Sequence, residues 1–350
     1  MHMSDALLSP TVGGAMWAAT AGTMAYCSKK VGKEMDDIKV PLMGVLGAFV
    51  FAAQMINFTI PGTGSSGHIG GGLLLAVLLG PHAAFLTLAS VLTVQALFFA
   101  DGGLLALGSN IFNLGAFPCF IAYPLVYRAI NKSGTTKSRL VLSTTVAAIL
   151  GLQLGSLGVV LQTTLSGIAE LPFASFLLIM QPIHLAIGLV EGLVTAAVLL
   201  FIRQARPDLV GEADGKTTAA WSVNRILLGL AVSFLLIGGI VSWFASSRPD
   251  GLEWSIAKTT GNREIAEREH DMHRSLAELQ EKTALMPDYA LQEDSAPETV
   301  AENGRRFSMD PRLQTTAAGL IGGFLTLLTV LILGMVIKKS RTRHDGKPSL

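Results

Sequence analysis

Long stretches without any charged residue alternate with short charged clusters along this 350-residue chain. A helix that crosses a lipid bilayer needs about 20 mostly apolar residues, so most of these stretches hold one span and the longest holds several. Breaks at proline, glycine and charge clusters give nine candidate spans: 11–27, 41–60, 69–80, 82–100, 104–128, 140–165, 173–202, 226–245 and 315–337. The pattern predicts an all-α integral membrane protein.

The candidate spans fall into two groups. Residues 1–205 are rich in Gly and Ala, whose small side chains let helices approach closely in a membrane, and we predict a seven-helix bundle for them. The polar stretch 206–224 is predicted to be a cytoplasmic linker. Residues 225–340 are predicted to hold two helices that flank a long outer loop, 246–314, with 14 acidic and nine basic residues.

The basic residues in the connecting segments predict the orientation. If every span crosses and the N-terminus is outside, 17 of the 26 Lys and Arg residues face the cytoplasm. The other nine lie in loop 246–314, and long loops are exempt from the positive-inside rule. We therefore expect a multi-pass protein of the cell inner (plasma) membrane with a cytoplasmic C-terminus. Span 69–80 would cover only about 18 Å, but a re-entrant half-helix there would place the basic cluster at 128–139 outside.

Composition excludes several classes of protein. Half of the residues are hydrophobic and 15% are charged, against roughly a quarter charged in soluble domains. The two cysteines are too few for a disulfide framework or a thiolate metal site and are expected to pack as small apolar residues. The chain has no G-x-x-x-x-G-K-[ST] loop, no nucleophile–base constellation and no zinc pattern, so we predict no enzyme, and no nucleic-acid partner.

The first two residues can form a metal chelate. Asp5 is the only charged residue before Lys29, so the start lacks the basic leader of a secretory signal. His2 follows a Met that is expected to be retained, because initiator Met is normally removed only ahead of small side chains. The terminal amine of Met1 and the amide nitrogen and Nδ1 of His2 then supply three nearly coplanar ligands. Square-planar nitrogen coordination favours Ni(II) or Cu(II). A chance histidine at position 2 is the alternative.

A glycine-rich loop supplies a candidate fourth ligand. The sequence PGTGSSGHIGGG, residues 61–72, places His68 on the same predicted outer side as the N-terminus. Glycine permits positive φ angles and close backbone approach, and irregular backbone at membrane depth is tolerated only inside protein or along a cavity. His68 could complete a plane of four nitrogens. The alternative is a flexible outer turn with an incidental histidine.

Other polar residues leave their roles open. His270 and His273 in the outer loop have i, i+3 spacing, which suits either cation capture or a solvated helix face. His184 and Glu191 lie seven residues apart on one helix face and are either functional or a buried pair that holds helices together. Side-chain amides could bond between helices or support the metal ligands: Gln54, Asn57, Gln95, Asn110 and Asn113.

Residues 57–113 closely resemble the CbiM/NikM family, the substrate-specific subunits of energy-coupling factor (ECF) importers for cobalt and nickel. The opening Met1-His2 and HLAIGLVEGLVTA at 184–196 fit the same family, and RPDGLEWSIAK at 248–258 resembles the PDGLE motif of the CbiN/NikN accessory subunit. The chain thus resembles a fused M–N subunit. The family usually has MHI at its start and GGTSGH in the loop, where this chain has MHM and GTGSSGH.

The resemblance implies both a ligand set and partners. By position, the family's metal ligands correspond to Met1, His2 and His68, in agreement with the chelation argument. The implied partners are a transmembrane coupling (T) subunit and two cytoplasmic ATPase subunits. The chain itself lies in the lipid bilayer.

The predicted function is that of the substrate-capturing subunit of an ATP-driven importer, with Ni²⁺ favoured over Co²⁺ as the bound substrate. Four planar nitrogens suit Ni(II), which stands above Co(II) in the affinity order for nitrogen sites. A cobalt importer subunit for cobalamin synthesis and an ATP-independent secondary transporter are the alternatives.

Overall fold

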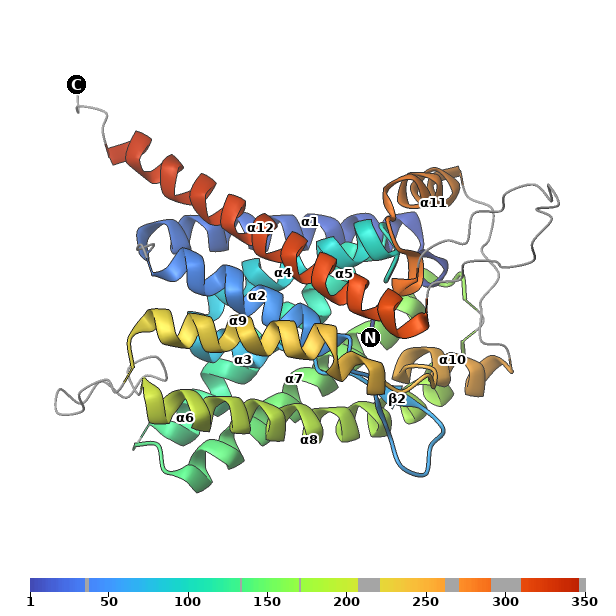
Figure 1. The fold of residues 1–350 in the computed structure, drawn as a ribbon. Helices are drawn as coiled ribbons and strands as arrows, with labels where there is room; N and C mark the ends of the chain where they lie inside the picture. The colour runs from blue at the N-terminus through green and yellow to red at the C-terminus, as the bar shows by residue number, and fades with distance from the viewer. Residues whose placement is uncertain are drawn as a thin grey trace, which may run out of the picture.

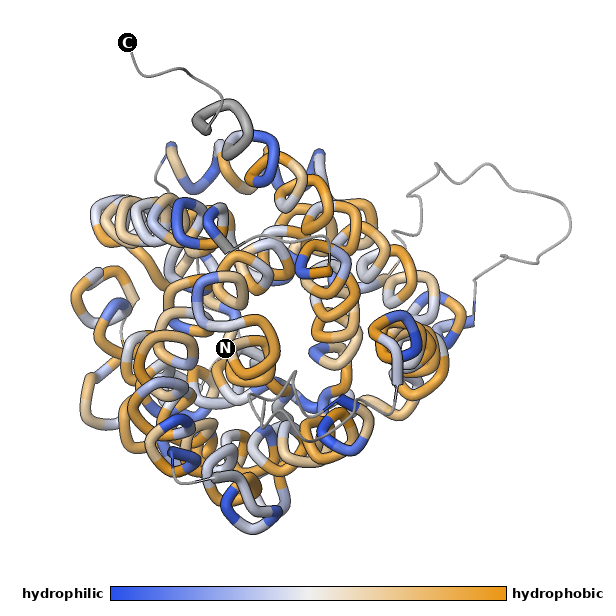
Figure 2. The backbone as a smooth tube through the Cα atoms, turned by 90° about the vertical axis from the view of Figure 1, so that its left-hand side faces the viewer, coloured by the Kyte–Doolittle hydropathy of each residue, from blue (hydrophilic) through white to orange (hydrophobic). Residues whose placement is uncertain are grey.

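The computed structural model describes residues 1–34, 38–132, 134–169, 171–206, 221–261, 271–290 and 310–345. Its long helices run roughly side by side in an elongated bundle (Figure 1). Seen along the bundle, the helices surround the N-terminus (Figure 2), and Met1 is only 6% exposed. The start of the chain is therefore enclosed by the bundle.

The first part of the chain, residues 1–206, is mainly helical. A short 3-10 turn, η1, precedes the first long helix, and a two-residue antiparallel hairpin with Phe58 opposite Gly67 precedes the third. The elements are η1 (Asp5–Leu7), α1 (Pro10–Glu34), α2 (Lys39–Gln54), β1 (Phe58–Thr59), β2 (Ser66–Gly67), α3 (Gly72–Leu79), α4 (Pro81–Phe99), α5 (Leu107–Ile111), the π-helix η2 (Phe112–Tyr127), α6 (Arg128–Asn131), α7 (Lys137–Ser166) and α8 (Phe173–Ala205).

The second part, residues 221–345, packs against the first along α2. Its two long helices both contact α2, and its short α10 contacts α8. The elements are α9 (Val223–Gly239), η4 (Val241–Phe244), α10 (Gly251–Thr260), α11 (Asp271–Thr283), η5 (Pro287–Tyr289) and α12 (Pro311–Asp345). We call this part the accessory part.

Each predicted span coincides with helix over most of its length. Within the described ranges, five helical segments are long and apolar enough to cross a membrane: Pro81–Phe99, Leu107–Asn131, Lys137–Ser166, Phe173–Ala205 and Pro311–Ser340. The apolar helices α2 and α9 are shorter. Helix α2 ends at Gln54, earlier than the predicted 60, and the residues that follow lead into the hairpin that begins at Phe58.

The third predicted span is the least regular. Helix α3 has eight residues, about 12 Å of rise, and begins at Gly72, three residues later than predicted. Gly71 precedes it with φ +76°, and a Cβ there would lie 2.6 Å from a Val50 methyl group. Only glycine fits such a position without strain. Residues 68–71 are consequently non-helical backbone that lies among helices.

Local sequence signals set where several helices begin. Pro81 stands at the first position of α4, where a missing N–H costs no helical bond, directly after Gly80 with φ +80°. The Thr136 hydroxyl accepts a bond from Arg139 N–H at the start of α7. Asp250 and Glu253 form a capping box at the start of α10, which satisfies backbone N–H groups that no helical carbonyl can reach.

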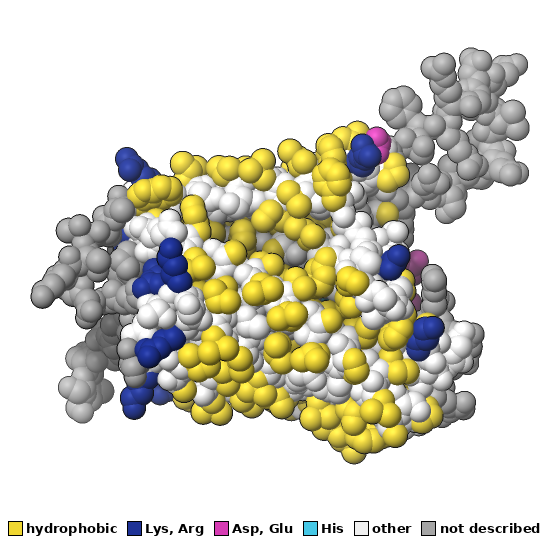
Figure 3. All heavy atoms as spheres, turned by 90° about the horizontal axis from the view of Figure 1, so that it is seen from below, with side chains coloured by type: hydrophobic (Ala, Val, Ile, Leu, Met, Phe, Trp, Pro, Cys, Tyr) yellow, Lys and Arg dark blue, Asp and Glu magenta, His cyan; other side chains and the backbone are white. Residues whose placement is uncertain are grey.

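Charge is distributed unevenly along the bundle. Figure 3 shows most of its Lys and Arg side chains along the end of the molecule where α1 passes to α2, fewer of them near acidic side chains at the other end, and a broad hydrophobic band between the two ends. The hydrophobic band is the surface expected to face lipid tails. The N-terminus, α10 and α11 lie toward the opposite end (Figure 1).

Candidate metal-binding site

The N-terminal segment is anchored by its backbone. Met3 N–H donates to Asn110 Oδ1 at 2.8 Å, and Asn110 Nδ2 donates back to the Met3 carbonyl at 3.1 Å. Asp5 Oδ1 accepts from Ala106 N–H at 2.9 Å. Met3 and Leu8 are fully buried. These bonds connect the segment to α5 and to the residue just before it, and they fix the direction in which Met1 and His2 extend.

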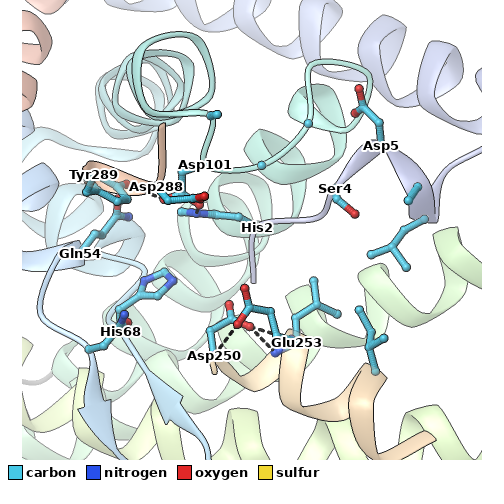
Figure 4. A pocket seen from close by; sticks show the side chains of 18 of the residues that line it. His2, Ser4, Asp5, Gln54, His68, Asp101, Asp250, Glu253, Asp288 and Tyr289 are labelled. Atoms are coloured by element: carbon cyan, nitrogen blue, oxygen red, sulfur yellow. Dashed lines mark hydrogen bonds and ion pairs between the residues drawn. The ribbon is translucent and has the colours of Figure 1, made fainter. Parts of the chain in front are cut away.

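His2 and His68 face each other in the bundle. Their ring centroids are 5.1 Å apart with a 46° tilt, and Figure 4 shows both rings at the same cavity. His2 Nδ1 donates to Asp101 Oδ1 at 2.5 Å, while its Nε2 is buried and has no hydrogen-bond partner among the described residues. The predicted ligands Met1, His2 and His68 are thus brought together from distant parts of the sequence.

Two carboxylates that the sequence did not single out complete the surroundings. The Met1 terminal ammonium donates to Asp250 Oδ2 at 3.2 Å, and Asp101 pairs with His2. Burial alone would raise the pKa of Asp250, but the ammonium, a backbone N–H and His68 outweigh it and lower the pKa to about 2. For Asp101 burial is likewise outweighed, by His2 and by two hydrogen bonds, so its pKa lies below its usual range. Both carboxylates are ionised at neutral pH.

The His68 ring is held as a neutral imidazole. Burial, the nearby terminal ammonium and His2 lower the pKa of His68 to about 3. Its Nδ1 lies 3.1 Å from the Ile69 carbonyl, so Nδ1–H is the donor there. The other ring nitrogen, Nε2, then carries a lone pair, which is the form in which imidazole binds a metal.

The glycine loop that carries His68 is fixed at both its N–H and its C=O groups. Gly70 and Gly71 N–H donate to the two carboxylate oxygens of Glu191 at 2.7 and 3.2 Å. Gln54 Nε2 donates to the Gly70 carbonyl at 2.8 Å, and Gln95 Nε2 donates to Gln54 Oε1. Glu191 lies near the middle of α8, so the loop reaches well into the bundle. Its irregular backbone is satisfied by protein groups, as a membrane interior requires.

The accessory part reaches the same loop from outside. Ser66 N–H donates to the Pro249 carbonyl at 2.8 Å, and Ser66 Oγ donates to the Arg248 carbonyl at 2.8 Å. These bonds place Asp250 beside Met1. A cavity of about 1000 Å³ opens between the two parts. It is lined by both histidines, His2 and His68, and by acidic side chains that include Asp101, Asp250, Glu253 and Asp288 (Figure 4).

The other candidate residues take different roles. Glu191 anchors the loop, while His184 bonds through Nδ1 to the Met180 carbonyl, so the two do not pair with each other. His273 Nε2 contacts the carbonyls of Asp5 and Leu8, and His270 lies outside the described residues. Of the predicted supporting amides, Gln54, Gln95 and Asn110 bond around the site, whereas Asn113 pairs with Gln162.

The site differs from a cluster of metal-binding side chains. Among the described residues, no three His, Cys, Asp or Glu side chains converge as a metal-binding group. The predicted set contains only two such side chains, because two of its nitrogens belong to the main chain. Sequence reasoning missed Asp101, although a signal was present: it is the only Asp, Glu, Lys or Arg between Lys39 and Arg128.

Apolar helices around a buried amine, two histidines and two carboxylates describe a membrane protein that handles a transition-metal cation. Comparison with known proteins agrees. Residues 2–209 match the family model described as the cobalt uptake substrate-specific transmembrane region, and residues 224–339 match the PDGLE domain. The chain belongs to this family of nickel and cobalt transport proteins, and combines its transmembrane region with a PDGLE domain.

Several relatives and a solved structure are similar to this chain over part of its length. A putative fused nickel transport protein, NikMN, of Archaeoglobus fulgidus is 34% identical over 251 residues, covering 69% of this chain and 79% of that protein. A cobalt transport protein, CbiM, of Sorangium cellulosum is 32% identical over 223 residues, covering 60% and 94%. The crystal structure of a transition metal transporter is 30% identical, with a TM-score of 0.53, and covers 62% of this chain and 100% of that chain.

Proposed function

We propose that this chain is the substrate-capturing membrane subunit of an ATP-driven, ECF-type importer, with Ni²⁺ favoured over Co²⁺ as its substrate. The observation that carries the proposal is the burial of the Met1 amine beside His2 and His68, two neighbouring imidazoles. A terminal ammonium is costly to bury unless it is paired. A role of the Met1 amine as a metal ligand would explain why the chain buries it inside the bundle.

The proposed ligands are the Met1 amine, the amide nitrogen and Nδ1 of His2, and a ring nitrogen of His68. In the structure the amine contacts Asp250 and Nδ1 faces Asp101. Metal binding therefore requires the amine to lose a proton and the His2 ring to turn its Nδ1 away from Asp101. Both changes are local, because the backbone of the N-terminal segment is already fixed by Asn110 and Ala106.

The two carboxylates favour a doubly charged substrate. Asp101 and Asp250 are ionised and largely enclosed, so a cation that enters the site meets two negative charges within low-dielectric surroundings. A Ni²⁺ ion with one deprotonated amide leaves a net charge of about +1 on the chelate, which these carboxylates offset. We therefore propose that they neutralise the metal without occupying its ligand plane.

The ligand set supports the preference for nickel. Planar nitrogen coordination suits Ni(II), and Zn(II), with its tetrahedral habit, fits such a plane poorly. The names of the relatives include both nickel and cobalt transport proteins, so cobalt is the second candidate. Titration of Co(II) into nickel-loaded protein tests the preference: retention of a diamagnetic, square-planar nickel spectrum supports it, and displacement at equimolar Co(II) contradicts it.

The proposed membrane arrangement has seven crossing helices in residues 1–205 and two in residues 225–340. The N-terminus is outside and the basic end of the bundle faces the cytoplasm of the inner membrane, in accord with the positive-inside rule. The proposed partners are a transmembrane coupling subunit and two cytoplasmic ATPase subunits.

An N-terminal extension tests the metal site directly. One added residue before Met1 turns the amine into an amide, and we expect high-affinity Ni²⁺ binding to be lost. A C-terminal tag of the same protein is the control and should leave the bound nickel, measured by elemental analysis, at one ion per chain. Full nickel content in the extended protein would refute the proposed ligands.

Transport in membrane vesicles tests the importer mechanism. Vesicles with this chain, the coupling subunit and both ATPase subunits are expected to accumulate radioactive Ni²⁺ only with ATP. Uptake by the chain alone, driven by a proton gradient, would instead support a secondary transporter.

A further inference from the structure

A tyrosine of the accessory part is connected to the proposed ligand His2 through one intervening residue, Asp101. Tyr289 in η5 donates its hydroxyl hydrogen to Asp101 Oδ2 at 2.5 Å, and Asp101 Oδ1 accepts from His2 Nδ1 at 2.5 Å. Figure 4 shows Tyr289, Asp101 and His2 along one side of the cavity. Asp101 thus receives one hydrogen bond on each oxygen, from opposite parts of the chain.

The Tyr289 ring is fixed in place by packing. It stacks on Phe99 at a centroid distance of 4.9 Å and an interplanar angle of 18°, and it contacts the edge of Phe51. Burial and the adjacent Asp101 charge raise the pKa of Tyr289 well above its ordinary value, so the hydroxyl retains the hydrogen that it donates. Packing and charge together hold this phenol as a donor aimed at Asp101.

The backbone near this contact is strained on both sides. Outside glycine, positive φ angles among the described residues occur only at Ala100, Asp288 and Tyr289. Ala100 directly precedes Asp101, and the other two residues are Tyr289 itself and its neighbour Asp288. Such conformations are unfavourable for residues other than glycine and persist where the surrounding structure imposes them. All three of these left-handed residues therefore lie next to, or at, the contact between Tyr289 and Asp101.

The outer segment 271–289 is bonded to the end of α4, which leads to Asp101. Gln280 Nε2 donates to the carbonyls of Ala96 and Gly102 at 2.8 Å each. The N–H groups of Leu285 and Met286 donate to the Phe98 carbonyl. The last carbonyls of a helix have no partners within the helix, so the accessory part satisfies two of those of α4 and thereby fixes its own position relative to Asp101.

We propose that Tyr289 is a positioning residue of the metal site: through Asp101 it sets the orientation of the His2 ring. The inference rests on the proposed function of the site. Without the phenol, Asp101 loses the bond that restrains one oxygen, and the carboxylate can rotate. The remaining oxygen also becomes a stronger acceptor for His2 Nδ1–H. The stronger bond from His2 to Asp101 disfavours the turn by which His2 presents Nδ1 to a metal ion.

The test is Tyr289→Phe in the full chain, with Ni²⁺ as the probe. Phe retains the ring that stacks on Phe99, so folding should be preserved. We expect one Ni²⁺ per chain, bound about 10- to 100-fold more weakly, the range found when a partner of a metal ligand is removed. Tyr26→Phe, at an exposed tyrosine near the basic end, is the matched control and should bind like the parent. Equal affinity of Tyr289→Phe and the parent would overturn the inference.

A double-mutant cycle separates positioning from a general structural effect. If Tyr289 acts through Asp101, Tyr289→Phe should cause no further loss of affinity in an Asp101→Asn background. Additive losses would show that Tyr289 acts elsewhere and would refute the inference. As an independent measurement, the ¹⁵N ring signals of His2 should shift in Tyr289→Phe while those of His82 stay unchanged. A parent protein that binds no Ni²⁺ would refute the proposed function itself, a result distinct from the failure of this inference.

Discussion

The two parts of the chain approach the proposed metal site in different ways. The first part inserts backbone: the N-terminal residues and the glycine loop lie among helices, and Asn110, Gln54 and Glu191 bind their main-chain groups. The accessory part contributes side chains from outside, namely Asp250 and Tyr289. The first part therefore supplies all the proposed nitrogen ligands, and the accessory part supplies groups that hold them.

This difference predicts a hierarchy of effects. Changes to ligands or to the loop backbone in the first part should abolish or strongly weaken binding, since they alter the ligand plane itself. Changes at the junction with the accessory part should weaken Ni²⁺ binding by smaller factors, because all the proposed ligands are still present. The following variants test this order.

The largest effect is expected for His68→Ala. Loss of a ligand should exceed the effect of losing a supporting residue, so Ni²⁺ affinity should fall by more than about 100-fold. The control is His82→Ala, because His82 starts α4 at the opposite end and contacts Tyr26 and Phe120. Isothermal titration of both proteins measures the difference. Parent-like binding by His68→Ala would place the metal elsewhere.

An intermediate effect is expected for Glu191→Gln. The amide offers one acceptor oxygen where the carboxylate offers two, so Gly70 or Gly71 loses its buried partner, at a cost of about 1–3 kcal/mol. The melting temperature should fall and Ni²⁺ should bind about 10-fold more weakly. Asn131→Leu is the control, since it removes a bond between Asn131 and Ser143 at the basic end and should affect stability alone. An unchanged affinity in Glu191→Gln would show that the loop does not depend on this anchor.

The smallest effect is expected at the junction, for Ser66→Ala. The variant removes the hydroxyl hydrogen, which the Arg248 and Pro249 carbonyls share, but keeps the backbone bond from Ser66 N–H to the Pro249 carbonyl. One hydrogen bond contributes about 1 kcal/mol net, roughly a fivefold change in affinity. Ser233→Ala, which removes a bond within α9, should leave Ni²⁺ binding unchanged. If Ser66→Ala lost as much Ni²⁺ affinity as His68→Ala, the proposed difference between ligands in the first part and supporting groups in the accessory part would be refuted.

Much of the molecule was predictable because its signals are local. Charge-free runs mark segments that prefer a lipid environment, and all nine predicted segments contain helix. The glycines around His68 indicate unusual backbone, and chelation by Met1 and His2, which rests on neighbouring atoms of one residue pair, stays a prediction. The short length of the third span indicated irregularity, and the structure shows that its first residues are non-helical.

Only the tertiary structure decided which groups surround the ligands. Asp101 meets His2 across 99 positions, Asp250 meets Met1 across 249, and Tyr289 meets Asp101 across 188. Glu191 likewise bonds a loop 120 residues away. Hydrophobic patterning determines that a segment is a buried helix, since burial depends on the residue's own chemistry. The partner of a buried polar group depends instead on how helices pack and which backbone groups are left without bonds, and that is settled only when the whole chain folds.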